Sequence, residues 1–271
     1  MFAKLKHFLC GRPAASSSLG TCKSDGEVPE PNMGETERVE RAAKAVRMIE
    51  EGNSFEDAGN FDAAMNLYKI AVSIAPEMAR AHLNLGNIYM VKEDYESSLD
   101  CFSQALHCDP DYSAGYYNKG NAHARLGQNA EALDCYRTAL RINPHFVNAE
   151  VAQGYILQEI GDPGNAIACY ERALAMQPNY AEVYCNLGNA LGELGKQSEA
   201  IDALHRALAI NPDCANAFQN LGHIWKELGQ LEKALACYSQ ASILEPYSAK
   251  ACSDILFIHN FLLDQSAAET F

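Results

Sequence analysis

The sequence of 271 residues lacks the motifs of the common enzyme and metal-binding classes. It contains no Cys-x-x-Cys pair, no Cys and His residues at zinc-finger spacing, and no phosphate-binding loop, Gly-x-Ser-x-Gly or His-Glu-x-x-His motif. No stretch approaches the roughly 18 apolar residues that would span a membrane. We therefore expect no catalytic site, cofactor, metal or membrane span in this chain.

Positive charge is also scarce, because 21 Lys and Arg residues face 35 Asp and Glu residues, for a formal net charge of −14. Nucleic-acid-binding surfaces and polybasic membrane anchors need clustered Lys and Arg. The composition thus argues against nucleic-acid and membrane partners. The N-terminal residues lack the apolar core of a secretion signal, and residues 11–34 are rich in Ser, Pro and Gly. We expect a disordered tail over residues 1–35 and a cytoplasmic location.

The ten cysteines do not suggest a disulfide framework. Four of them, Cys101, Cys135, Cys169 and Cys237, lie on a 34-residue grid. A small residue that recurs at a fixed spacing indicates packing, and a reduced Cys behaves as a small buried hydrophobe. We expect these four thiols to be reduced and buried, which fits a reducing cytosol.

What the sequence does contain is a 34-residue repeat, first visible in its prolines. Six prolines follow one another at this spacing: Pro76, Pro110, Pro144, Pro178, Pro212 and Pro246. With proline at position 32 of each unit, the repeats cover residues 45–78, 79–112, 113–146, 147–180, 181–214 and 215–248. Such a period is typical of stacked repeat architectures.

Other repeat positions define two helices in each unit. Position 8 is always Gly and position 27 always Ala, position 20 is Ala or Ser, and position 24 is aromatic except for Leu204. Positions 4, 7, 8 and 11 form one helical face, and positions 20, 24 and 27 form another. Gly at position 15, replaced only by Glu93, suits the tight turn between them. Proline at position 32 ends the second helix, and Pro163 lies where a second helix should begin.

These residues resemble the tetratricopeptide repeat (TPR). The resemblance implies an all-α fold, a right-handed solenoid of six helix-turn-helix repeats over residues 36–248, with one extended helix from about Thr36 to Phe55. Two repeats depart from the pattern, the first at Met48 and Glu51 and the fourth at Glu150 and Gln153. We still expect both to fold as helix pairs.

Asparagine is concentrated at positions 6 and 9 of the first helices. The residues are Asn84, Asn87, Asn118, Asn121, Asn186, Asn189 and Asn220. Helix propensity does not account for them, and a primary amide both donates and accepts hydrogen bonds. By resemblance to the family, first helices line a concave groove, where these amides would grip the backbone of an extended peptide. The alternative is that the asparagines hold neighbouring helices together.

The asparagines at position 6 are similar to those in the repeat domain of O-linked N-acetylglucosamine (O-GlcNAc) transferases, where an Asn ladder holds substrate polypeptide. The matching residues are Asn84, Asn118, Asn186 and Asn220, and Ala152 interrupts the ladder. Residues 249–263 are expected to form an apolar helix, and Ser266-x-x-Glu269 matches a capping box. The segment from Ser253 to Phe271 resembles the junction to the glycosyltransferase domain in bacterial relatives. The resemblance implies a substrate-recognition module whose catalytic domain would follow in cis. The alternative is a self-contained TPR adaptor that assembles other proteins.

Overall fold

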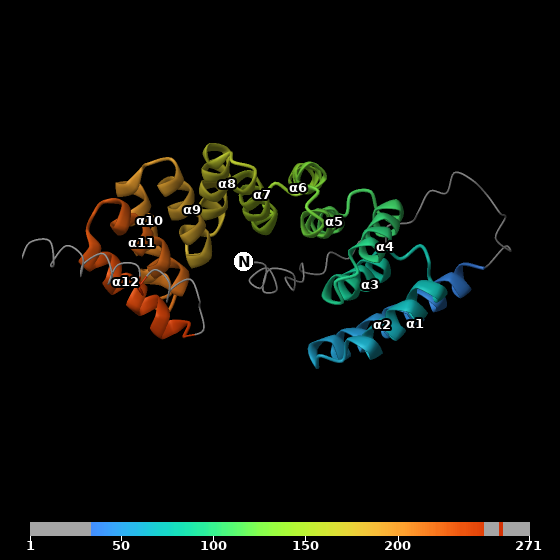
Figure 1. Ribbon diagram of the computed structural model, residues 1–271. Coiled ribbons are helices and arrows are strands. Elements are labelled where there is room, and N and C mark those ends of the chain that lie inside the picture. Colours follow the sequence, from blue (N-terminus) through green and yellow to red (C-terminus); the bar gives the residue numbers. More distant parts are fainter. Residues whose placement is uncertain (1–33, 247–254, 257–271) are drawn as a thin grey trace, which may run out of the picture. The chain divides into compact units, whose positions relative to one another are not determined.

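The computed structural model describes residues 34–246 and 255–256, shown as coloured ribbon in Figure 1. The predicted tail (1–35) and the predicted C-terminal helix and domain start (249–271) therefore lie almost entirely outside the described residues. The described part contains no strand, so the predicted all-α class is confirmed.

Twelve α-helices make up the described array, and they form six consecutive pairs. Their bounds are α1 Glu35–Asp57, α2 Phe61–Ile74, α3 Ala79–Val91, α4 Tyr95–Cys108, α5 Ser113–Arg125, α6 Asn129–Ile142, α7 Val147–Glu159, α8 Pro163–Met176, α9 Ala181–Glu193, α10 Gln197–Ile210, α11 Ala215–Glu227 and α12 Leu231–Leu244. The odd-numbered helices are the first helices of the repeats and the even-numbered ones are the second helices. The chain divides into two compact units, Met1–Ala149 and Glu150–Phe271.

Helix ends follow from the residues at the repeat boundaries. In each repeat the second helix ends two residues before the proline at position 32. Helix α4, for example, ends at Cys108, two residues before Pro110. Proline disfavours helical geometry at the residue that precedes it. At position 16, the side chains of Asn60, Asp94 and Asp162 accept hydrogen bonds from backbone N–H groups in the first turn of the second helix. Pro163 occupies the start of α8 as expected.

The turn between paired helices requires a left-handed residue at position 15. Five repeats place glycine there, with φ between 70° at Gly229 and 81° at Gly161. The second repeat has Glu93 instead, at φ 61°. A side chain makes this region costly, which is why glycine is the usual choice.

Each pair is held by a close approach between position 8 and position 24. A Cβ atom on Gly86 would lie 2.5 Å from the ring of Phe102, and one on Gly120 would lie 2.6 Å from the ring of Tyr136. The other four repeats show the same arrangement, with separations up to 2.7 Å. Five rings and, in the fifth repeat, the side chain of Leu204 therefore fill the space that the absent side chain leaves, and they are buried.

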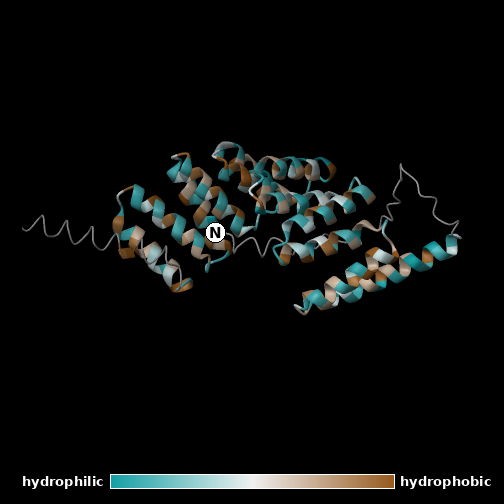
Figure 2. Cartoon of the chain, turned by 45° about the vertical axis from the view of Figure 1, so that its right-hand side comes forward, coloured by the Kyte–Doolittle hydropathy of each residue, from teal (hydrophilic) through white to brown (hydrophobic). Residues whose placement is uncertain are grey.

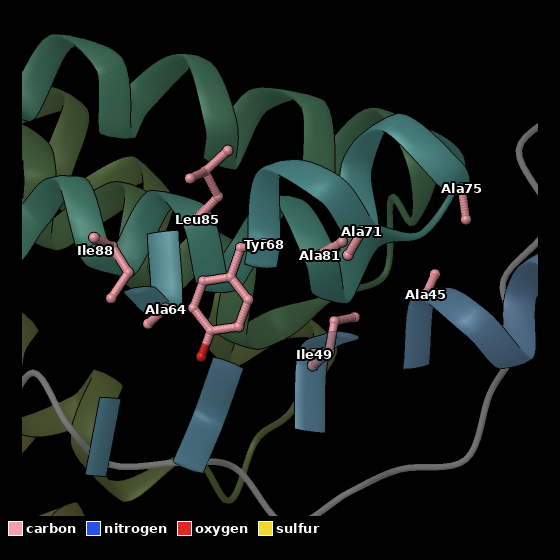
Figure 3. Close-up of a cluster of buried hydrophobic side chains, with 9 residues drawn as sticks. All are labelled: Ala45, Ile49, Ala64, Tyr68, Ala71, Ala75, Ala81, Leu85 and Ile88. Atoms are coloured by element: carbon pink, nitrogen blue, oxygen red, sulfur yellow. The ribbon is translucent and has the colours of Figure 1, made fainter. Parts of the chain in front are cut away.

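The first core cluster shows how successive pairs join. Ala45 and Ile49 of α1, Tyr68 of α2, and Leu85 and Ile88 of α3 are buried against one another, together with small alanines (Figure 3). Helix α1 is a single long helix, as predicted. Its departure from the repeat pattern is accommodated because Met48 packs on this cluster and Ile49 is fully buried.

The fourth repeat has an ion pair where it departs from the repeat pattern. Glu150 of α7, at the usual aromatic position, is only 6% exposed. Arg172 of α8 binds it with two hydrogen bonds, from Nε to Oε1 and from Nη2 to Oε2, both 2.9 Å long. A buried carboxylate is tolerated when it is paired in this way.

None of the described helices combines the length and apolar character needed to cross a membrane. Figure 2 shows hydrophilic and hydrophobic residues interleaved along them.

Candidate functional site

In the first compact unit, the predicted asparagines link successive first helices. Nδ2 of Asn84 in α3 donates to Oδ1 of Asn53 in α1 at 3.0 Å. Nδ2 of Asn118 in α5 donates to Oδ1 of Asn87 in α3 at 2.8 Å. Position 6 of one repeat thus binds position 9 of the repeat before it. This is the contact that the structural alternative predicts, and it uses one of the two N–H groups of each donor amide.

The side chain at position 9 also serves the buried tyrosine at position 24. The hydroxyl of Tyr68 donates to Asn53 Oδ1 and that of Tyr136 to Asn121 Oδ1, both at 2.8 Å. The Tyr238 hydroxyl lies 3.0 Å from Nδ1 of His223. Asn121 is only 2% exposed, so we leave it out of the surface that a ligand could reach.

Sequence reasoning missed this pairing, although the repeats carry a signal for it. Where position 24 lacks a hydroxyl, as at Phe102 and Leu204, the asparagine at position 9 turns to another partner. Asn87 then accepts from Asn118, and Asn189 donates to Glu193 at 2.9 Å. A hydroxyl at position 24 therefore adds a hydrogen bond to the asparagine at position 9, which at Asn53 coexists with the hydrogen bond from Asn84.

In the second compact unit, the asparagines are less engaged. Within the described residues, the half-buried Asn186 of α9 makes no hydrogen bond through its amide. Asn189 is exposed. Nδ2 of Asn220 in α11 lies 3.4 Å from the carbonyl oxygen of Cys185, a long hydrogen bond. These amides retain more hydrogen-bonding capacity than those of the first unit.

A groove of about 250 Å³ lies between the first helices α9 and α11 of the second unit, which contact each other directly and are labelled in Figure 1. Its lining includes Asn189, Gly192 and Glu193 from α9 and Asn220, Lys226 and Glu227 from α11. Two of the seven predicted asparagines thus meet in one groove. The sequence signal that we missed is Gly192, because position 12 carries a side chain in all other repeats.

Burial shapes the chemistry of the thiols on the 34-residue grid. Desolvation raises the pKa of Cys101 and of Cys169 to about 11, and it also raises the pKa of Cys135 and of Cys237. Cys169 is buried as predicted, whereas the other three are half-buried, which corrects that expectation. Groups of three or more His, Cys, Asp or Glu residues that could hold a metal ion are absent from the described residues.

Protein-family models recognise the repeats over most of the helical array. Two models described as "Tetratricopeptide repeat" match residues 79–112, 113–146 and 181–214, and residues 215–246. A model described as "TPR repeat" matches residues 52–92 and 154–195. Together the matches cover residues 52–146 and 154–246. No curated protein matches the sequence at a significant level.

Solved structures share the fold at low identity. PilF of Pseudomonas aeruginosa is 17% identical with a TM-score of 0.71, over 82% of this chain and 99% of PilF. The APC/C hetero-tetramer Cut9-Hcn1 is 17% identical with a TM-score of 0.70, over 79% of this chain, which spans 43% of the matched chain. YrrB, described as a TPR protein with an unusual peptide-binding site, is 25% identical with a TM-score of 0.57, over 69% of this chain and 96% of YrrB.

The repeat positions, the paired helices of the described residues and the family-model matches agree with one another. The chain therefore belongs to the tetratricopeptide-repeat family.

Proposed function

We propose that this protein binds an extended polypeptide segment on the exposed face of its first helices. The observation that carries the proposal is the groove between α9 and α11, where Asn189 and Asn220 come together. Each of these amides has donated one hydrogen bond within the chain, and within the described residues its Oδ1 accepts none. Both carbonyl oxygens can therefore accept N–H groups from a peptide backbone.

The small floor of the groove favours a backbone ligand over a bulky one. Gly192 exposes no side chain there, and a Cβ atom at this position would have no neighbour closer than 3.8 Å, so a main chain can approach helix α9 closely. Glu227, on the other side of the groove, is exposed and takes part in no ion pair within the described residues. It offers a contact for a donor or a positive charge on the bound segment.

YrrB supports the proposal, since a protein 25% identical to this chain over 69% of its length has a peptide-binding site in its description. The finer proposal is that the bound polypeptide is the substrate of an O-GlcNAc-transferase-like enzyme. It rests on the asparagines at position 6, which are Asn84, Asn118, Asn186 and Asn220. The alternative is a self-contained adaptor that binds peptide for assembly.

The coding sequence that flanks this chain separates these two roles. A glycosyltransferase reading frame continuous with the chain supports the finer proposal, and an unrelated frame favours the adaptor. Peptide binding itself is tested separately, so the two results do not depend on each other.

Asn186 is the best probe of peptide binding, because its amide makes no hydrogen bond within the described residues. Peptides selected from a random display library on the whole protein would be measured against the Asn186→Ala and Asn66→Ala variants. Asn66 is an exposed asparagine on the second helix α2, outside the proposed face. We expect Asn186→Ala to weaken binding by about 0.5–1.5 kcal/mol for each lost hydrogen bond, with an unchanged urea midpoint.

Asn118→Ala provides the structural contrast, since it also removes the hydrogen bond to Asn87. It should lower the urea midpoint whether or not a ligand binds. Equal peptide affinity in wild type, Asn186→Ala and Asn66→Ala would contradict the proposed face.

A further inference from the structure

Two thiols of the second unit lie in contact where helix α9 meets the start of helix α11. Sγ of Cys185 in α9 lies 3.2 Å from Sγ of Cys214, which immediately precedes α11. Both are present as unoxidised cysteines. They lie 29 residues apart, off the 34-residue grid of the packing cysteines, so the repeat pattern does not account for their meeting.

The two thiols differ in environment. Cys185 is 3% exposed, whereas Cys214 is half-buried and can be reached from solvent. Cys214 is the N-cap residue of the 13-residue helix α11. The unsatisfied N–H groups and the dipole at a helix N-terminus stabilise a thiolate, which is the reactive form of cysteine. Cys214 is thus the nucleophile of the pair, and Cys185 is positioned to react with whatever forms on Cys214.

We propose that Cys185 and Cys214 form a reversible redox site that a hydroperoxide converts into a disulfide between α9 and the start of α11. The Cys214 thiolate attacks one peroxide oxygen and displaces the other as hydroxide or alkoxide, which leaves a sulfenic acid on Cys214. The Cys185 sulfur then attacks the Cys214 sulfur. The S–O bond breaks, the sulfenic hydroxyl leaves as water with the proton of Cys185, and the S–S bond forms. A dithiol reductant reverses the oxidation.

The geometry requires little movement. The sulfur atoms approach from 3.2 Å to the roughly 2.05 Å of a disulfide. The packing cysteines offer an internal contrast, because burial keeps them protonated and raises the pKa of Cys101 and of Cys169 to about 11. Oxidation should therefore select Cys214 over the packing thiols.

The disulfide would act on the groove of the proposed function. Cys185 precedes Asn186 in the chain, and its carbonyl oxygen accepts the hydrogen bond from Asn220. Helices α9 and α11 both line the groove. A covalent link between them fixes their separation beside these amides, although the redox chemistry itself does not depend on peptide binding.

The test treats the whole reduced protein with hydrogen peroxide, blocks remaining thiols with iodoacetamide, and identifies linked peptides by mass spectrometry after proteolysis. We expect a Cys185–Cys214 peptide that disappears after dithiothreitol treatment. In Cys185→Ser, dimedone should label Cys214 as a trapped sulfenic acid. Cys214→Ser should show neither product, and Cys135→Ser, a matched control at a packing cysteine, should behave as wild type.

Circular dichroism checks that the variants fold, and Cys185→Ala replaces Cys185→Ser if the buried hydroxyl prevents folding. The oxidised wild type should unfold at a temperature several degrees higher than the reduced protein. The proposal is overturned if peroxide yields no Cys185–Cys214 peptide, or if dimedone labels Cys214 no faster than Cys135. A peptide-binding result, positive or negative, leaves this outcome unaffected.

Discussion

Two glycines in helix α9, Gly188 and Gly192, differ in whether the structure has room for an added methyl group. A Cβ on Gly188 would lie 2.6 Å from Cγ of the fully buried Leu204 and 3.2 Å from the backbone oxygen of Ala200. A Cβ on Gly192 would meet nothing closer than Ile224, at 3.8 Å. We expect Gly188→Ala to lower the free energy of unfolding by about 1–3 kcal/mol through overpacking.

Gly192→Ala is the control within the same helix. It should raise the free energy of unfolding by about 0.5–1 kcal/mol, because alanine loses less entropy in a helix than glycine does. Urea denaturation of both variants measures the difference. Equal urea midpoints for the two variants would show that the packing of Leu204 against position 8 does not require glycine there.

Replacing Glu93 should also stabilise the protein. It holds a left-handed conformation that glycine supplies in the other five repeats. Its carboxylate lies 3.8 Å from Arg125 and is largely exposed, so the pair contributes little. Glu93→Gly should raise the free energy of unfolding by roughly 0.5–1 kcal/mol.

Gly127, at the same repeat position as Glu93, allows the opposite substitution, from glycine to a residue with a side chain. Its φ is 74° and a Cβ would meet nothing within 4 Å, so Gly127→Ala should lower the free energy of unfolding by about 1 kcal/mol for conformational reasons alone. Thermal melts of both variants show whether each substitution raises or lowers the stability of the protein. A lower melting temperature for Glu93→Gly would mean that Glu93 makes a contact worth more than its strain.

At the scale of elements, the pair α7 and α8 depends on one guanidinium. Arg172 holds the buried Glu150 through two hydrogen bonds. Arg172→Met leaves that carboxylate without its partner and should cost about 1–3 kcal/mol, because Arg172 is itself half exposed and water can partly replace it. The urea midpoint measures the loss.

Arg137→Met is the matched control, since Arg137 pairs with Asp134 on the surface of α6. It should change the free energy of unfolding by less than about 0.5 kcal/mol. Adding Glu150→Leu to Arg172→Met should recover much of the loss by restoring an apolar residue at position 4. An Arg172→Met variant as stable as Arg137→Met would exclude the ion pair as the support of this repeat.

At the scale of the whole chain, alkaline pH should destabilise both compact units. Burial raises the pKa of Cys101 in the first unit and of Cys169 in the second from an ordinary 9.0 to about 11. Unfolding between pH 9 and 11 therefore releases protons, so rising pH favours the unfolded state. The stability that these groups contribute is complete below pH 9 and is lost as the pH rises to about 11.

Urea midpoints at pH 8 and pH 10 test this for wild type and for Cys101→Ser/Cys169→Ser. Tyr117, with a pKa raised to about 12 by burial, acts in the same direction in both proteins. The double variant should therefore lose less stability between the two pH values than wild type. Identical losses would show that these thiols ionise as readily in the folded chain as in the unfolded one.

The sequence predicted the elements of this molecule better than the contacts of its polar residues. The prolines at position 32 and the glycines at positions 8 and 15 locate helix ends, close approaches and turns, because proline restricts its own backbone whereas glycine allows a left-handed turn or leaves room for a neighbouring side chain. The long first helix was predicted from about Thr36 to Phe55 and extends from Glu35 to Asp57. These features are local, so a single repeat contains the information.

The candidate site could be predicted only in part, because its geometry depends on residues of other helices. Asn121 is buried because Tyr136, 15 residues later, needs an acceptor. Glu150 is tolerated because Arg172 lies on the facing helix. Cys185 and Cys214 both fall in the repeat 181–214, but their contact depends on how the residue that leads into α11 packs on α9, which the spacing alone does not reveal.

Because the contact between position 8 and position 24 lies within one repeat, the chain can lose a whole 34-residue repeat without disturbing this contact in the others. Both partners lie inside one repeat, so excising residues 79–112 would remove a complete glycine-and-ring contact and leave the other five whole. The cut would place Asn118 after Asn53, the residue that now receives the amide of Asn84, and the link between neighbouring repeats could re-form. A deletion between position 8 and position 24 of a repeat would change the spacing between the glycine and its partner. The length of this protein can therefore change by whole repeats, while its interior stays the same.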